Sequence, residues 1–135
     1  MAGEVPLVRS VVAVAAGFFA STVMSLGADL AFRRMSPDSF DAEGQASGDG
    51  TLFVIMGYEV LFAAVAGYVT ARLAIRKPLA HALIMGAVVL VGRIPTAILS
   101  WSSVPVWFHL GVLLLIVPAA LLGAKIGAMR ANLAS

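Results

Sequence analysis

The sequence predicts an all-α protein, a membrane-embedded antiparallel four-helix bundle with both termini in the cytoplasm. Of its 135 residues, 61% are hydrophobic and 12% are charged, whereas a soluble domain carries about 25% charged residues. The apolar residues gather in four runs, each near the ~20 residues that span a bilayer. Most lysine and arginine residues lie in the segments that four such spans would place on one side of the membrane. We therefore expect residues 1–135 to form a single transmembrane domain.

The first predicted helix covers about residues 10–32, with the sequence SVVAVAAGFFASTVMSLGADLAF. Arg9 precedes this run, as a basic residue does in a secretory signal peptide. The run is about twice as long as the apolar region of such a peptide, and no A-x-A-like cleavage site closes it. We interpret it as a retained membrane helix.

The three further helices are predicted over about residues 52–73, 79–99 and 106–129. Residues 33–50 separate the first two helices and are rich in Ser, Asp and Gly, so they predict the one sizeable loop, on the outer side. The other two connections are short, a basic IRKP turn over 75–78 and an uncharged turn over 100–105.

The orientation follows from the basic residues of the short loops. An even number of spans puts both termini on the same side of the membrane, and that side holds more lysine and arginine residues than the other. It carries Arg9, Arg72, Arg76, Lys77, Lys125 and Arg130, against Arg33 and Arg34 on the other side. This asymmetry predicts an N-in, C-in, multi-pass protein of the cell (inner) membrane, with Trp101 and Trp107 at the outer interface.

Small residues recur every four positions on three of the predicted helices. Such stripes let helix backbones approach closely in lipid. They pack helices within the bundle or, alternatively, form contacts with a second copy or another membrane protein. The predicted packing positions are Gly17, Ser21, Ser25, Gly67, Gly123 and Gly127.

Four polar residues lie inside the predicted spans, where ionisable side chains are costly and often functional. They are Asp29, Glu59, Arg93 and His109. Glu59 and Arg93 each fall roughly 9–11 Å below the outer ends of their apolar runs. Because the short IRKP turn makes their helices antiparallel neighbours, we expect the Glu59 and Arg93 side chains to lie at the same depth in the membrane. All four side chains fall in the outer half, where they could converge.

Two interpretations of this polar cluster stay open. In the first it is structural: Glu59 and Arg93 pair to dock two helices, Asp29 pairs with Arg33 one turn on, and His109 is an interfacial residue beside Trp107. In the second it is a site that binds a ligand, an ion or a proton.

Several kinds of chemistry find no support in the sequence. The chain has no cysteine, which excludes thiolate nucleophiles and cysteine-ligated metals. His81 and His109 are predicted at opposite faces of the membrane, so they cannot share one haem iron. Zinc-binding, serine-hydrolase and phosphate-loop motifs are missing. The net charge of +2 gives no basic patch for nucleic acid. We expect no enzyme activity, metal or cofactor.

The stretch GYVTARLAIRKPLAHALIMGAV, with the later VPVWFHLGVLLLIVPAALLGAKI, resembles small bacterial four-helix integral membrane proteins. The resemblance covers the second to fourth helices and implies no activity.

Two functions therefore remain as expectations. One is a non-enzymatic structural or accessory membrane subunit, in contact with the lipid bilayer and with either a second copy or another membrane protein. The other is a small transporter or ion or proton pathway that uses Asp29, Glu59 and Arg93.

Overall fold

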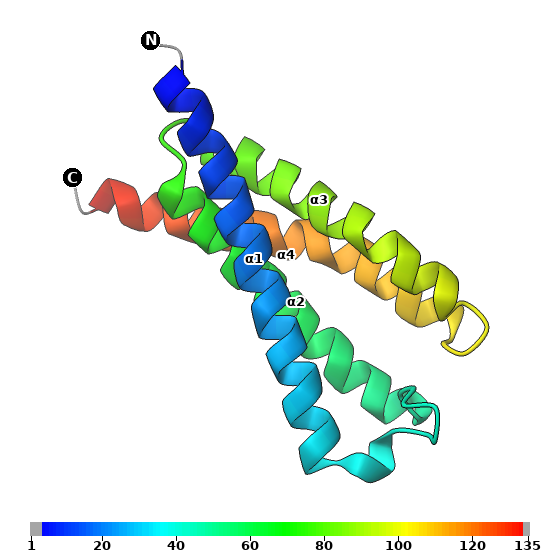
Figure 1. The fold of residues 1–135 in the computed structure, drawn as a ribbon. Coiled ribbons are helices and arrows are strands. Elements are labelled where there is room, and N and C mark those ends of the chain that lie inside the picture. Colours follow the sequence, from blue (N-terminus) through cyan, green and yellow to red (C-terminus); the bar gives the residue numbers. More distant parts are fainter. Residues whose placement is uncertain (1–3, 134–135) are drawn as a thin grey trace.

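The structure is a computed structural model that describes residues 4–133 and is all-helical (Figure 1). Its membrane-length helices are α1 (Glu4–Met35), α2 (Gly48–Leu73), α3 (Pro78–Leu99) and α4 (Val106–Leu133), with a short 3-10 helix η1 (Pro37–Ser39). All four are long and apolar enough to cross a membrane, which confirms the predicted helical class and indicates a membrane-embedded protein. The predicted domain, residues 1–135, extends beyond the described residues at both ends.

The helices are longer than the apolar runs that predicted them. α1 begins at Glu4 instead of about residue 10, α2 begins at Gly48, and α4 continues to Leu133. An apolar run ends where charged residues begin, but helical hydrogen bonding continues through them. The 32 residues of α1 make a rod of about 48 Å, longer than the roughly 30 Å of hydrocarbon in a bilayer. The loop between α1 and α2 is correspondingly shorter than predicted, 36–47 instead of 33–50.

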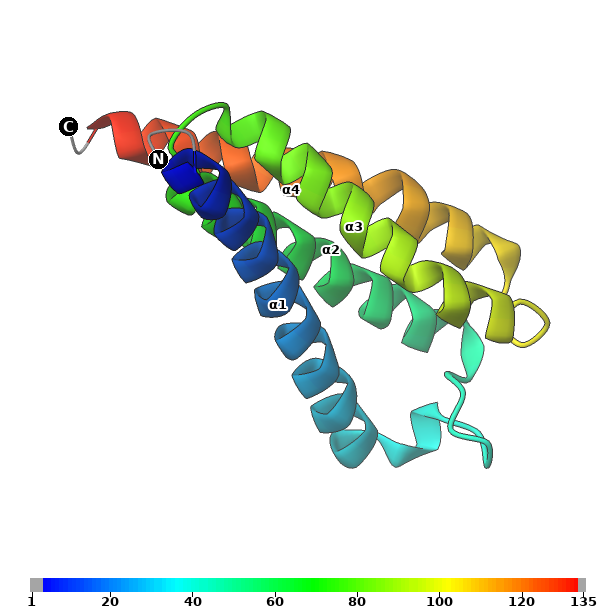
Figure 2. The same cartoon turned by 45° about the horizontal axis from the view of Figure 1, so that its top comes forward.

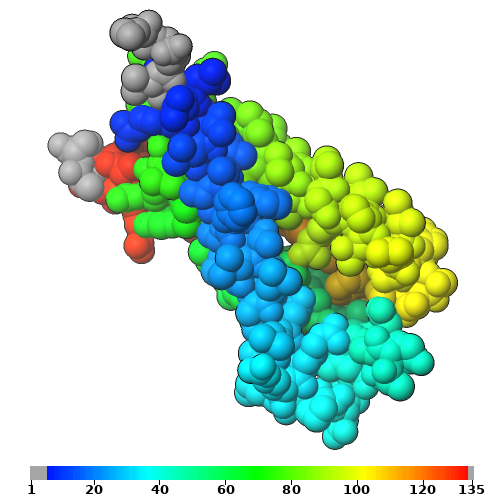
Figure 3. Space-filling model, viewed as in Figure 1, coloured from blue at the N-terminus to red at the C-terminus, as the bar shows by residue number. Residues whose placement is uncertain are grey.

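Consecutive helices run in opposite directions (Figures 1 and 2). We call the end with the start of α1, the turn 74–77 and the end of α4 the terminal end, and the end with residues 36–47 and 100–105 the loop end. α1 leans away from α3 and α4 toward the loop end (Figure 2). In the space-filling view the surface is notched there, between the α1–α2 side and the α3–α4 side (Figure 3).

The loop 36–47 is folded by local hydrogen bonds. The backbone N–H of Gln45 donates to the Asp41 carboxylate at 2.7 Å. The Arg33 guanidinium donates to the carbonyl oxygen of Gly44 and lies over the Phe40 ring, 4.6 Å from its centroid. The last turn of α1 is thereby tied to the loop that follows it.

Many large apolar side chains face outward, and alanine makes up most of the buried apolar core. Phe19 and Leu114 are 63% and 70% exposed, as expected where lipid is the solvent. Three buried clusters follow one another along the bundle: Ala63 with Val112 and Ile116, Ala66 with Met85 and Ala120, and Ala71 with Ala82 and Ala124.

The α2–α4 interface is the most extensive in the bundle, and two glycines make it close. A methyl group added at Gly67 would overlap the backbone of Ala120, and one added at Gly123 would overlap the backbone of Ala64. The two helices thus touch through their backbones, as small-residue stripes in membranes permit.

The other predicted packing positions also face inward. Gly17 of α1 fits against Thr70 and Ala66 of α2, and Gly127 of α4 lies beside Tyr68 and Ala71. Ser21 is 5% exposed. These stripes make contacts inside the chain, and contacts with a second copy stay a prediction.

Gly67→Ala should lower the free energy of unfolding by about 1–3 kcal/mol, because the added methyl group forces α2 and α4 apart. The matched control is Gly57→Ala on the same helix, where an added Cβ meets no atom within 4 Å. The control should be neutral or stabilising, since alanine is the better helix former. The measurement is the temperature at which half of the detergent-solubilised protein aggregates. Equal midpoints for the two variants would mean that Gly67 is not a contact position.

Candidate functional site

Glu59 of α2 is the centre of a polar network that joins three helices. The residue is 5% exposed. Its Oε2 atom accepts a hydrogen bond of 3.1 Å from the Ser25 hydroxyl of α1 and is ion-paired with the Arg93 guanidinium of α3. One carboxylate oxygen therefore holds α1 and α3 to α2.

Glu59 and Arg93 meet because their helices are antiparallel neighbours and both side chains lie at one depth. The Arg93 side chain keeps 30% of its surface exposed, and that of Glu59 keeps 6%. Among the described residues this is the one ion pair. A buried carboxylate needs such a partner, because an uncompensated charge in a low-dielectric interior is strongly unfavourable.

Asp29 of α1 is held by a residue that the sequence analysis did not single out. The Tyr58 hydroxyl of α2 donates to the Asp29 carboxylate. The suggested pairing of Asp29 with Arg33 is not found, because Arg33 turns to Gly44 and Phe40 instead. A tyrosine in a membrane span needs a partner for its hydroxyl, and this was the available signal for Tyr58.

His109 of α4 lies apart from the Glu59 network and is stacked on an aromatic ring. It is 7% exposed, and its ring is parallel to that of Trp101 within 13°, with centroids 5.1 Å apart. Trp107, its suggested neighbour at the interface, stacks on Phe53 instead. The atom Nε2 of His109 is buried and has no hydrogen-bond partner among the described residues.

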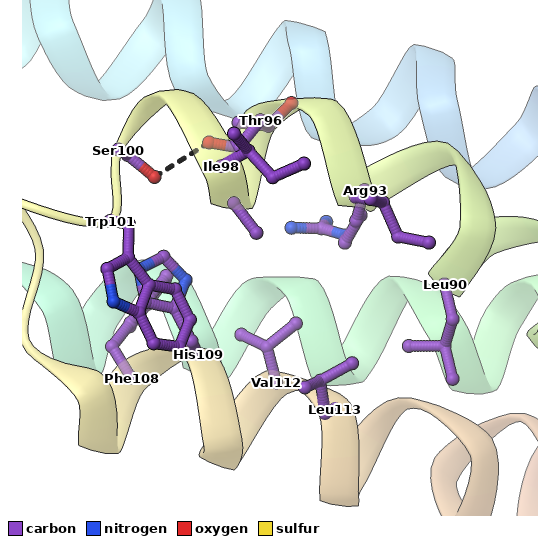
Figure 4. Close-up of a pocket in the computed structure, with 12 residues that line it drawn as sticks. Leu90, Arg93, Thr96, Ile98, Ser100, Trp101, Phe108, His109, Val112 and Leu113 are labelled. Carbon is purple, nitrogen blue, oxygen red and sulfur yellow. Dashed lines mark hydrogen bonds between the residues drawn. The ribbon is translucent and has the colours of Figure 1, made fainter.

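A pocket of about 200 Å³ between α3 and α4 links the two parts of the polar cluster (Figure 4). Arg93 and His109 both line it, and Figure 4 shows the guanidinium directed back toward the Trp101–His109 pair. The four predicted side chains thus form two groups: Asp29 and Glu59 with their partners at the α1–α2 side, and His109 in the pocket. Arg93 belongs to both.

The donor atoms of the cluster do not make a metal centre. Within residues 4–133, no three His, Cys, Asp or Glu side chains lie close enough to hold an ion. His81 lies in the first turn of α3, at the terminal end, where its Nδ1 is 3.0 Å from the Lys77 carbonyl oxygen. It is therefore remote from His109, which lies toward the loop end. The site offers hydrogen bonds and one balanced ion pair.

Comparisons of the chain with protein-family models, with curated proteins and with solved structures found no match. The geometry of the chain therefore carries the functional argument.

Removing one partner of the ion pair should harm the protein more than removing both. Arg93→Gln strands the buried Glu59 carboxylate, and breaking such a pair costs about 3–5 kcal/mol. Glu59→Gln should cost less, because the partly exposed Arg93 side chain can turn toward the bundle surface. The double variant should recover part of the loss, measured as thermal midpoints of the four purified proteins. Losses that simply add in the double variant would show that the two residues are not coupled.

Proposed function

We propose that the protein is a non-enzymatic multi-pass membrane protein that acts as a structural or accessory subunit. The observation that carries this proposal is the backbone contact of α2 and α4 at Gly67 and Gly123. It lies in the half of the bundle toward the terminal end, whereas Glu59, Arg93 and His109 lie toward the loop end. A path for a substrate or ion would have to cross the close-packed half.

The arrangement of the charges supports the same proposal. Glu59 is already bound by Ser25 and Arg93, and Asp29 by Tyr58. Each bond joins two helices, so the polar side chains fasten α1 and α3 to α2. A transport carboxylate must instead exchange its partners for the transported ion or proton.

The surface of α1 supports a protein partner, either a second copy or another membrane protein. The loop half of α1 stands away from α3 and α4 (Figure 2), and Leu26 on it is 64% exposed. A Cβ atom added at the neighbouring Gly27 would have no atom within 4 Å, so this part of the α1 surface is open. A neighbouring transmembrane helix would fit against this face.

The proposed topology places the terminal end in the cytoplasm of a cell with an inner membrane. It rests on the basic residues near that end, among them Arg72, Arg76 and Lys77, and on the acidic loop at the other. Trp101 is 55% exposed at the loop end, which suits the outer membrane–water interface.

Single cysteines at Ser47 and Ala74 test this topology, and the natural chain has no cysteine to give background. On intact cells an impermeant thiol reagent should label the Ser47→Cys variant. It should label the Ala74→Cys variant only after the membrane is opened. The reverse pattern would invert the orientation.

A photo-crosslinking amino acid at Leu26 tests the accessory role in living cells. We expect it to form an adduct with one defined protein, whether a second copy or a different subunit. The matched control is the same amino acid at Leu114, which is 70% exposed on α4 and should react with lipid only. Lipid adducts alone at both positions would contradict a partner on this face.

The alternative is a small transporter or ion or proton pathway, and the ionisable residues at membrane depth are what favour it. Proteoliposomes with an internal pH-sensitive dye separate the two functions. The accessory role predicts the same proton leak as empty vesicles. A flux that disappears in the folded Glu59→Gln, Arg93→Gln double variant would establish the pathway instead.

A further inference from the structure

The pocket between α3 and α4 has the position of a site for a molecule dissolved in the membrane. Its rim includes Ile94, Ile98 and Leu113, which are 51%, 70% and 48% exposed on the outer surface of the bundle. A ligand can therefore enter sideways from the lipid. With about 200 Å³, the pocket is smaller than the roughly 300–1,000 Å³ of sites that enclose a whole ligand. It can hold a headgroup whose tail stays in the bilayer.

The polar atoms of the pocket call for a ligand that accepts hydrogen bonds. Arg93 lines it and has further N–H groups beyond the one paired with Glu59. The Trp101 indole carries an N–H that can only donate. The Ser100 hydroxyl is already used, since it donates to the Thr96 carbonyl oxygen at 2.8 Å. No carboxylate side chain lines the pocket in the described chain.

His109 adds a donor that nothing within the described chain uses. The imidazole lines the pocket, and its Nε2 is buried without a partner. An unsatisfied buried polar group raises the free energy of the folded protein. In the tautomer that carries its proton on Nε2, His109 would regain this free energy by donating to a ligand oxygen.

Charge and shape narrow the ligand further. The positive charge of Arg93 is balanced by Glu59, so the pocket offers no net positive charge that would stabilise a buried anionic headgroup. A neutral oxygen acceptor needs no such charge. The parallel rings of Trp101 and His109 lie at one end of the pocket with their edges toward the rest of it (Figure 4). A carbonyl group of a flat ligand can therefore lie in the plane of the imidazole, and aromatic edges also pack favourably against a ring.

We infer that this pocket binds the head of a quinone-type molecule, a flat neutral ring with carbonyl oxygens and an apolar tail. Arg93 and His109 donate to the carbonyl oxygens, and the Trp101–His109 stack contacts the ring. The tail leaves between Ile98 and Leu113 into the lipid. This binding is independent of the accessory role, because it uses α3 and α4, whereas the proposed partner face is on α1.

Tryptophan fluorescence tests the inference, because quinones quench indoles at short range and the chain has two tryptophans. In a Trp107→Phe background, Trp101 is the single reporter. Titration of the purified protein in lipid nanodiscs with decylubiquinone should give saturable quenching. Adding His109→Phe, which keeps a ring against Trp101 but removes Nε2, should weaken the apparent affinity at least tenfold. Leu113→Phe, which narrows the rim without touching a polar group, should weaken it as well.

Two controls separate the site from simple partitioning into lipid. His81→Phe, at the other end of α3, should bind as the background does. A Trp101→Phe protein that reports through Trp107 should show only linear, non-saturating quenching. Linear quenching of Trp101, or unchanged affinity in both His109→Phe and Leu113→Phe, would overturn the inference. Displacement of the quinone by equimolar oleate would also overturn it, since the pocket would then prefer a carboxylate.

Discussion

The contact on which the rest of the bundle depends is the backbone approach of α2 and α4 at Gly67 and Gly123. Lipid tails are as apolar as leucine, so helices in a membrane gain little by hiding large side chains from them. Close packing and interhelical hydrogen bonds must hold them together instead. At Gly67 and Gly123 no side chain separates the helices, and dispersion contacts run along both backbones. α1 then joins the same level of α2, with Gly17 set against Thr70.

The half of the bundle toward the loop end is held together differently. α1 leans away from α3 and α4 there (Figure 2), and polar side chains link it to α2. Glu59 accepts bonds from α1 and α3 at a single oxygen, so charge replaces small-residue packing as the link between helices. A pocket between α3 and α4 lies in the same half of the bundle, with His109 buried at its wall. Close backbone packing thus holds one half of the bundle together, and polar contacts between helices hold the other.

Part of the candidate site was predictable from the chain alone. Glu59 and Arg93 could be matched because depth along a helix is set by a constant rise per residue, and a short turn makes their helices neighbours. The direction in which a side chain points around its helix axis is not set in this way. For this reason the partner of Asp29 proved to be Tyr58 rather than the nearby Arg33. Ser25, predicted as a packing residue, also donates to Glu59.

The sequence by itself determined that this protein has four membrane-length helices, because long apolar runs have no other stable form in lipid. It also predicted small-residue stripes as packing positions, since small side chains let backbones approach closely, but it left open whether they pack inside the chain or against a partner. The tertiary structure decided which helices touch most closely and how far α1 leans from α3. It also decided that His109 is stacked on Trp101, with a nitrogen that has no partner among residues 4–133. These features depend on rotations about helix axes and on crossing angles, which arise only when all four helices pack together.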